Sequence, residues 1–162
     1  MDAYTCIVSK RDTRSYTDKP IPPEALSRIL QAGRMAGSAK NTQLSRFVVL
    51  EERERKQELA SCGQFAAHIP SAAVVVAVVM SKEGRDFDAG RCAQNMMLAA
   101  HTEGIASCPV SMHDQDCARR ALGLPEGHRV PIVIAFGYPP ATPRAPGVPR
   151  ISLDELVHRG GW

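Results

Sequence analysis

The sequence predicts a single domain in which helices flank a mixed β-sheet. Short Val- and Ile-rich runs alternate along the chain with longer runs of helical periodicity, and this alternation is typical of a sheet covered by helices. The 162 residues correspond to one domain of about 100–200 residues. The 44% hydrophobic and 23% charged fractions are those of an ordinary globular protein.

Two helices, one strand and a third helix are expected in the first 61 residues. Apolar residues at helical spacing predict a short helix over Ala3–Lys10, and the polar Arg11–Ile21 is a connection. Pro22-Pro23-Glu24 opens the next helix, because proline suits a first turn and an acid suits the positive end of the helix dipole. A buried strand over Phe47–Leu50 and a charged surface helix over Glu51–Ser61 follow.

The rest of the chain continues the alternation of strands and helices. Ala72–Met80 predicts a central strand, because it is β-branched and too short for a helix. Asp88–Gly104 predicts the longest helix, with an acid at its start and a glycine suited to its end. The remaining expected elements are strands over Ile105–Met112 and Pro131–Gly137, a helix capped by Asp114 and running to Leu122, a Pro-rich extended stretch over Tyr138–Pro149 and a last turn over Leu153–His158.

Composition argues against several classes of function. A net charge of +3 and 5% aromatic residues fall short of the basic stripe and stacking surface that nucleic-acid binding needs. The longest apolar run is far shorter than the ~20 residues of a membrane-spanning helix. The five cysteines show no CxxC spacing, and no secretory signal is visible at the N-terminus. We therefore expect a cytoplasmic protein with reduced thiols, no metal site, and neither nucleic acid nor membrane as a partner.

Four segments carry candidate binding residues. Lys10–Arg14 places three cations within five residues, which suits a dianionic phosphate; a solvated basic turn is the alternative. The polar loop Ser38–Gln43 offers amides that match the edge of a planar ring, or is a simple turn. Small residues in Gly104–Pro109 allow a planar ligand to approach the backbone, and Arg150 is an isolated cation. GxGxxG and P-loop motifs are absent from the sequence, so a nucleotide would be held in another way.

In this order, the segments resemble the FMN-dependent nitroreductase family. The matching parts are Lys10–Ile21, Gly37–Phe47, Asp88–Ala100 with Asn95, Gly104–Cys108 and Arg150–Leu156. The resemblance implies an α+β, three-layer fold and a single FMN-binding domain over residues 1–162. It also implies an intertwined homodimer with two FMN sites at the interface.

The resemblance further implies a set of cofactor-binding residues. The cations would face the phosphate and ribityl side of FMN, with Asp12 orienting Arg11 or Arg14. The polar loop would meet the flavin, partly from the partner chain, and the Ala106–Ser107 backbone would lie near the reactive edge of the ring. The full expected set is Lys10, Arg11, Asp12, Arg14, Ser38, Asn41, Gln43, Ala106, Ser107 and Arg150.

An FMN-dependent NAD(P)H oxidoreductase is the activity that the resemblance implies. NAD(P)H would reduce the flavin in a ping-pong reaction, and a small-molecule acceptor such as a nitroaromatic, quinone or enone would reoxidise it. The flavin carries this chemistry, so no catalytic side chain is expected. Two alternatives remain open: an oxidase or dehydrogenase on the same fold, like the cyclodipeptide oxidases that Gly104–Val110 resembles, and a flavin-binding protein without turnover.

Two features near the central helix complete the expectations. The Met80–Asp88 connection is short where the family usually places helices over the substrate, so the site should be open or covered by something else. Arg91, on the predicted central helix, is expected to pair with a carboxylate, with a flavin contact as the alternative. Cys108 and His113 are expected to be packing or surface residues.

Overall fold

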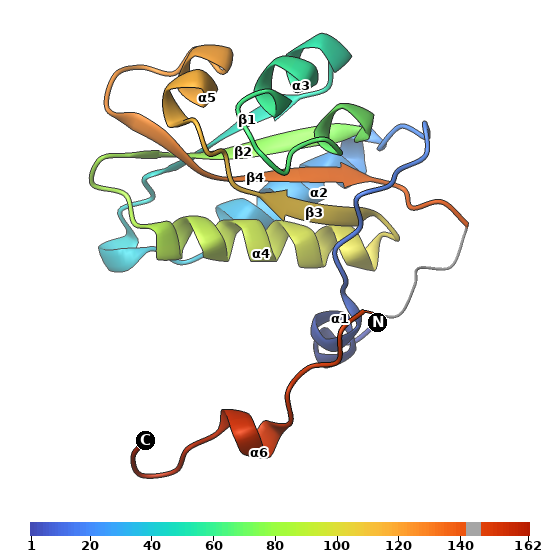
Figure 1. The fold of residues 1–162 in the computed structure, drawn as a ribbon, viewed down its shortest axis with the longest axis vertical. Coiled ribbons are helices and arrows are strands. Elements are labelled where there is room, and N and C mark those ends of the chain that lie inside the picture. The colour runs from blue at the N-terminus through green and yellow to red at the C-terminus, as the bar shows by residue number, and fades with distance from the viewer. Residues whose placement is uncertain (142–146) are drawn as a thin grey trace.

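The computed structural model describes residues 1–141 and 147–162, and its centre is a four-stranded sheet (Figure 1). The strands are β1 (Ser45–Leu50), β2 (Val74–Ser81), β3 (Ala106–Val110) and β4 (His128–Gly137), in the order β1-β2-β4-β3. All three neighbouring pairs are antiparallel. The mixed sheet expected from the sequence is therefore wrong for these four strands.

The position of β4 explains the difference. The connection from β2 to β3 runs through a long helix, and such a crossover normally joins parallel strands. Strand β4 lies between β2 and β3 and is antiparallel to both. Strands β2 and β3 therefore run in the same direction, but they are not neighbours in the sheet. A parallel bridge between Asp12 and Ser107 adds a short piece of chain at the outer edge of β3.

Helices cover both faces of the sheet and give it three layers (Figure 1). On one face lie α2 (Pro23–Arg34) and α4 (Asp86–Thr102), and on the other lie α3 (Arg53–Ala60) and α5 (Gln115–Ala121). The short helices α1 (Ala3–Ser9) and α6 (Leu153–Leu156) stand away from the sheet. Short 3-10 turns at Ala39–Asn41 and Ile69–Ser71 were not expected. The flanking helices confirm the expected α+β arrangement.

The central strand explains why the core has two halves. Val74, Val76 and Val78 of β2 point toward α2 and α4, whereas Val75 and Ala77 point toward α3 and α5. A strand buried on both faces shows a continuous apolar run instead of an alternating one. The Val-rich run was therefore a correct signal for a central strand.

Some expected boundaries shift. Asp114 caps α5, as expected, by accepting a hydrogen bond from Cys117 N at 2.8 Å. The long helix starts at Asp86, two residues earlier than expected, and this frees Asp88 for a tertiary contact. The Pro-rich stretch is described only in part, because Pro143 and Pro146 lie outside the described residues. Over the ranges that are described, no helix is long and apolar enough to cross a membrane.

A disulfide joins Cys62, just after α3, to Cys117 of α5. The two residues are 55 positions apart in sequence, and their Cα atoms are 5.4 Å apart. This bond corrects the expectation that all five thiols are reduced; Cys6, Cys92 and Cys108 are free and buried. Asp114 N donates to Cys62 O at 3.1 Å and ties the same two segments together.

We predict that reducing this disulfide lowers the free energy of unfolding. A cross-link that closes a loop of this length removes conformational freedom from the unfolded chain, which is worth about 4 kcal/mol. Urea titration of the parent with and without a reductant measures the difference. The double variant Cys62→Ser/Cys117→Ser is the control, because its stability should not respond to the reductant. An equal response of parent and variant would contradict the bond's role.

Candidate functional site

Three of the expected cations face one cavity of about 1010 Å³. Lys10 and Arg11, which follow α1, line it on one side, and Arg150 of the C-terminal segment also lines it. Gln94 and Met97 of α4 line its other wall. Three cations on one cavity provide the charge and the hydrogen-bond donors that a dianionic phosphate requires.

Local contacts hold the first two cations in place. The Lys10 amine forms an ion pair with the Asp12 carboxylate and lies 3.4 Å from the Met97 sulfur. Arg11 Nη1 donates to Val8 O at 2.7 Å and to Lys10 O at 2.8 Å, so it covers the C-terminal end of α1. Lys10 is a partner for Asp12 that the sequence reasoning did not consider, since it expected Arg11 or Arg14.

Arg14 does not line this cavity. Its charge acts instead on the Cys108 thiol, whose pKa it lowers against the larger effect of burial; this thiol lies on the α3/α5 side of the sheet, where Cys108 pairs with the buried Ala135. His68 lies nearby and is only 8% exposed, and its Nε2 has no hydrogen-bond partner among the described residues. Burial, and then the Arg14 charge, lower the pKa of His68. Burial raises the pKa of Cys108, so this thiol stays protonated at neutral pH.

The Ala106–Ser107 segment lies beside the cation segment. Thr13 N donates to Ser107 O at 3.0 Å, so residues 12 and 13 follow the outer edge of β3. The Ser107 hydroxyl is buried and, within the described chain, has no hydrogen-bond partner. A buried polar atom without a partner is unusual in a folded protein, so this hydroxyl is free to hydrogen-bond to a ligand.

The loop Ser38–Gln43 has a strained backbone. Lys40, Asn41 and Gln43 have φ values of 52°, 54° and 53°, in the left-handed region that costs a residue with a side chain about 1–3 kcal/mol. Ser38 Oγ accepts a hydrogen bond from Gln43 N at 3.0 Å, and Asp88 of α4 accepts one from Ala39 N at 3.4 Å. Such strain is typical of ligand-binding segments.

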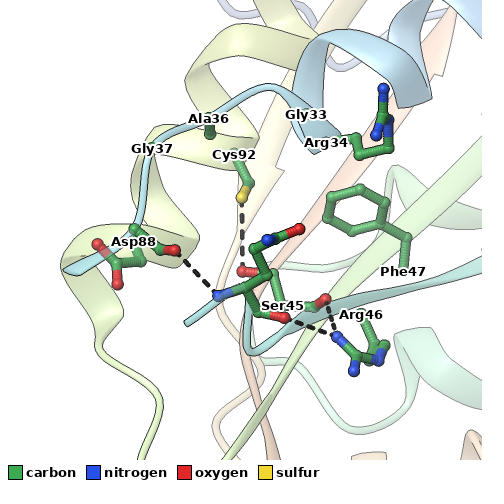
Figure 2. Close-up of a pocket in the computed structure, with 11 residues that line it drawn as sticks. Gly33, Arg34, Ala36, Gly37, Ser45, Arg46, Phe47, Asp88 and Cys92 are labelled. Atoms are coloured by element: carbon green, nitrogen blue, oxygen red, sulfur yellow. Dashed lines mark hydrogen bonds between the residues drawn. The ribbon is translucent and has the colours of Figure 1, made fainter. Parts of the chain in front are cut away.

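A second, smaller cavity of about 160 Å³ lies under this loop (Figure 2). Ser38 and Gln43 line it together with Asp88 and Cys92 of α4. Figure 2 shows the Cys92 sulfur directed toward Ser45, whose hydroxyl oxygen is 3.5 Å away. The cavity therefore lies between the loop, the start of β1 and the first turns of α4.

One chain does not bring the loop to the cations. The two cavities share no residue. Asp88, at the loop, and Met97, at Lys10, are nine residues apart on α4, which is about 14 Å along the helix axis. The structure thus assembles Lys10, Arg11, Asp12, Ser107 and Arg150 at one place. It puts Ser38, Asn41 and Gln43 at another.

Comparison with known proteins identifies the family. The nitroreductase family model matches residues 7–87 and 81–138. An Archaeoglobus fulgidus protein, named as a candidate NADH dehydrogenase/NAD(P)H nitroreductase, is 31% identical over 144 residues, which cover 82% of this chain and 83% of that protein. This chain belongs to the nitroreductase family.

Solved structures of this family have the same fold. An FMN-dependent nitroreductase from Clostridium difficile R20291 matches with a TM-score of 0.88 at 23% identity, over 98% of this chain and 99% of that one. A candidate nitroreductase from Desulfovibrio desulfuricans, in complex with FMN, matches with a TM-score of 0.86 at 28% identity, over 98% and 96%. Fold and family therefore agree.

Sequence reasoning missed several residues that line the candidate site. Gln94 and Met97 are three positions apart on a predicted helix, which puts them on one face, but no feature of the sequence showed that this face meets Lys10. The left-handed backbone at Lys40 was also missed, because lysine carries no signal for that conformation. Among residues 1–141 and 147–162, no group of three or more His, Cys, Asp or Glu side chains is placed to hold a metal ion.

Proposed function

We propose that this chain is an FMN-dependent oxidoreductase that accepts electrons from NAD(P)H and passes them to a small-molecule acceptor. The cavity with three cations and one acid carries the proposal, because it fits the phosphate of FMN. Names of relatives support it: a Vibrio harveyi protein that is 28% identical over 176 residues is an NADPH-flavin oxidoreductase. The structure of an NADPH:FMN oxidoreductase from the same organism is a complex with NAD⁺.

The residues present fit FMN in three ways. Lys10, Arg11 and Arg150 would bind the phosphate, and Asp12 would hold Lys10 in position through their ion pair. The unpartnered Ser107 hydroxyl and the adjacent Ala106 backbone would lie near the ring. Arg14 would act from the other face of the sheet, where its charge lies near Cys108.

FMN, when bound, supplies the redox chemistry, and the protein contributes binding and orientation. Among the described residues, neither Cys108 nor His113 is placed to act as a nucleophile. The Cys108 thiol is fully buried and protonated. His113 Nδ1 accepts a hydrogen bond from Gln64 N at 3.1 Å, and its ring packs against Phe65. The burial of Cys108 and the two contacts of His113 support the roles expected for these residues, which are structural and not catalytic.

We also propose that residues 1–162 form one FMN-binding domain that functions as a homodimer. The C-terminal segment with α6 extends away from the body of the protein (Figure 1). A capping box between Ser152 and Glu155 stabilises the N-terminal end of α6. Apolar side chains nevertheless face solvent along this segment, namely Val148, Ile151, Leu153, Leu156 and Trp162. So many exposed apolar residues on one segment mark an interaction site.

A second copy has a surface that suits this segment. A groove between α2 and β1 is lined by Leu26, Leu30 and Phe47, with Arg34 and Arg46 among its polar residues. Asp154 and Glu155 on α6 complement these cations. A dimer built on this contact would also let the Ser38–Gln43 loop of one protomer approach the cation cavity of the other.

The acceptor of the electrons from the reduced flavin would be a small molecule such as a nitroaromatic, quinone or enone.

We predict that the FMN-loaded protein loses its flavin absorption band when NADH or NADPH is added without oxygen. Hydride transfer from the nicotinamide to the bound flavin produces this loss, and an anaerobic spectrophotometric titration measures it. Dithionite is the control for a reducible flavin. Bleaching by dithionite but by neither nucleotide would favour the oxidase alternative or a flavin-binding protein without turnover.

Arg11→Ala and Arg150→Ala should each weaken FMN binding by about ten- to hundredfold, because each removes a charge-assisted hydrogen bond to the phosphate. Fluorescence titration of the apoprotein with FMN measures this change. Riboflavin lacks the phosphate and should bind both variants like the parent. Arg120→Ala, which removes an exposed cation on α5, is the matched control. Unchanged FMN affinity in both site variants would refute the assignment.

The parent should sediment as a dimer, and the double variant Leu153→Glu/Leu156→Glu should dissociate. The added carboxylates would replace the apolar side chains that face Leu26, Leu30 and Phe47 of the groove, and their desolvation against these residues opposes the contact. Leu153→Lys/Leu156→Lys, which also repels Arg34 and Arg46, should dissociate at least as fully. Sedimentation velocity measures the change, and the exposed substitution Tyr4→Glu on α1 serves as a control for added charge. A parent that remains a monomer with FMN bound would disprove the proposed assembly.

A further inference from the structure

An exposed aromatic ring and an arginine lie together at the start of α4. Phe87 is 74% exposed, and the guanidinium carbon of Arg91, one turn later, is 5.7 Å from the centre of its ring. Within the described ranges Arg91 forms no ion pair. The expected pairing with a carboxylate is therefore wrong, and the Arg91 charge is available to a ligand.

Packing fixes this pair beside the strained loop. A Cβ atom added to Gly37 would lie 2.6 Å from Arg91 Nη2, so the guanidinium lies directly on the Gly37 backbone. Asp88, between the two residues, is buried and accepts the hydrogen bond from Ala39 N. Phe87 and Arg91 therefore belong to the same rigid unit as the loop that we propose for the flavin.

The chain leaves this pair uncovered. Residues 82–85 alone connect β2 to α4, so no helix precedes Phe87 that could shield its ring. An exposed aromatic face stacks on planar ligands, and an unpaired guanidinium binds carboxylate or phosphate oxygens with two parallel hydrogen bonds. Side by side, the two groups suit an aromatic ring that bears an anionic group.

We propose that Phe87 and Arg91 form a subsite for the anionic aromatic part of a substrate. The inference rests on the proposed function, because the loop must face the flavin for the subsite to serve the reaction. Two substrates carry this chemistry: an aromatic carboxylate that accepts the electrons, and the nicotinamide dinucleotide with its adenine ring and phosphates. In both, Phe87 stacks on the ring and Arg91 binds the anionic oxygens.

Calorimetric titration with benzoate and with the neutral, equally sized benzamide tests the subsite without turnover. The FMN-loaded parent should bind benzoate about fivefold more tightly, as expected for an exposed ion pair of about 1 kcal/mol. Arg91→Gln should lose this preference, and Phe87→Ala should weaken both ligands alike. Arg85→Gln removes a nearby exposed cation and should retain the preference. If Arg91→Gln retains it, or if the parent does not distinguish the two ligands, the proposal is overturned.

Kinetics then distinguish the two sources of the anion. A loss of preference for 4-nitrobenzoate over 4-nitrobenzamide in the reoxidation of Arg91→Gln assigns the subsite to the acceptor. A loss of preference for NADPH over NADH in the reduction step assigns it to the dinucleotide. If neither preference changes, the subsite has no part in the reaction. If Arg91→Gln sediments like the parent, its lost preference is not caused by altered assembly. Failure of nucleotide bleaching in the parent would count against the proposed function and not against benzoate binding.

Discussion

Helix α4 connects the two parts of the candidate site. Its buried face packs so closely on α2 that a Cβ atom at Gly33 would lie 2.6 Å from the Met96 side chain. At one end Asp88 holds the strained loop, and at the other Met97 contacts Lys10. A helix packed in this way cannot bend to bring its ends together. The proposed binding groups of one chain therefore remain in two separate places, and the proposed homodimer would unite them.

The loop at the first end of α4 is organised before any ligand arrives. Three side-chain-bearing residues in the left-handed region are costly, and the hydrogen bonds of Ser38 and Asp88 offset part of that cost. A segment that is already ordered loses less conformational freedom on binding. Asp88 holds this loop, and Arg91 of the same helix lies on the backbone of Gly37, so the proposed substrate subsite and the proposed flavin loop would keep a fixed relative position.

The sequence predicted the elements well because their signals are local. The Val-rich run of β2, the helical periodicity of α4 and the cap at Asp114 each depend on neighbouring residues. The order of the strands does not depend on neighbouring residues, since β4 pairs with β2 and β3 through residues that are far apart in the chain. An apolar run buried on both faces also contains no information on the direction of its neighbours.

The cations of the candidate site also show that local sequence signals do not predict which distant residues meet. Their grouping in sequence predicted an anionic ligand, and Lys10 and Arg11 do face one cavity with Arg150. Arg14 instead lies near Cys108, and residues 12 and 13, which precede it, follow the edge of β3. The disulfide between Cys62 and Cys117 was also hidden, since the two residues are 55 positions apart and have no motif spacing.

The division of the site between two chains is tested most directly by mixing two defective variants. Arg11→Ala damages the cation half of the site, and Asn41→Ala damages the loop half. If each site takes its halves from different chains, a mixed dimer formed by joint refolding contains one intact site, built from the cations of one variant and the loop of the other. Tight FMN binding should therefore return in the mixture and in neither variant alone. If the mixture binds FMN no better than the average of the two variants, each site lies within a single chain and the account is contradicted.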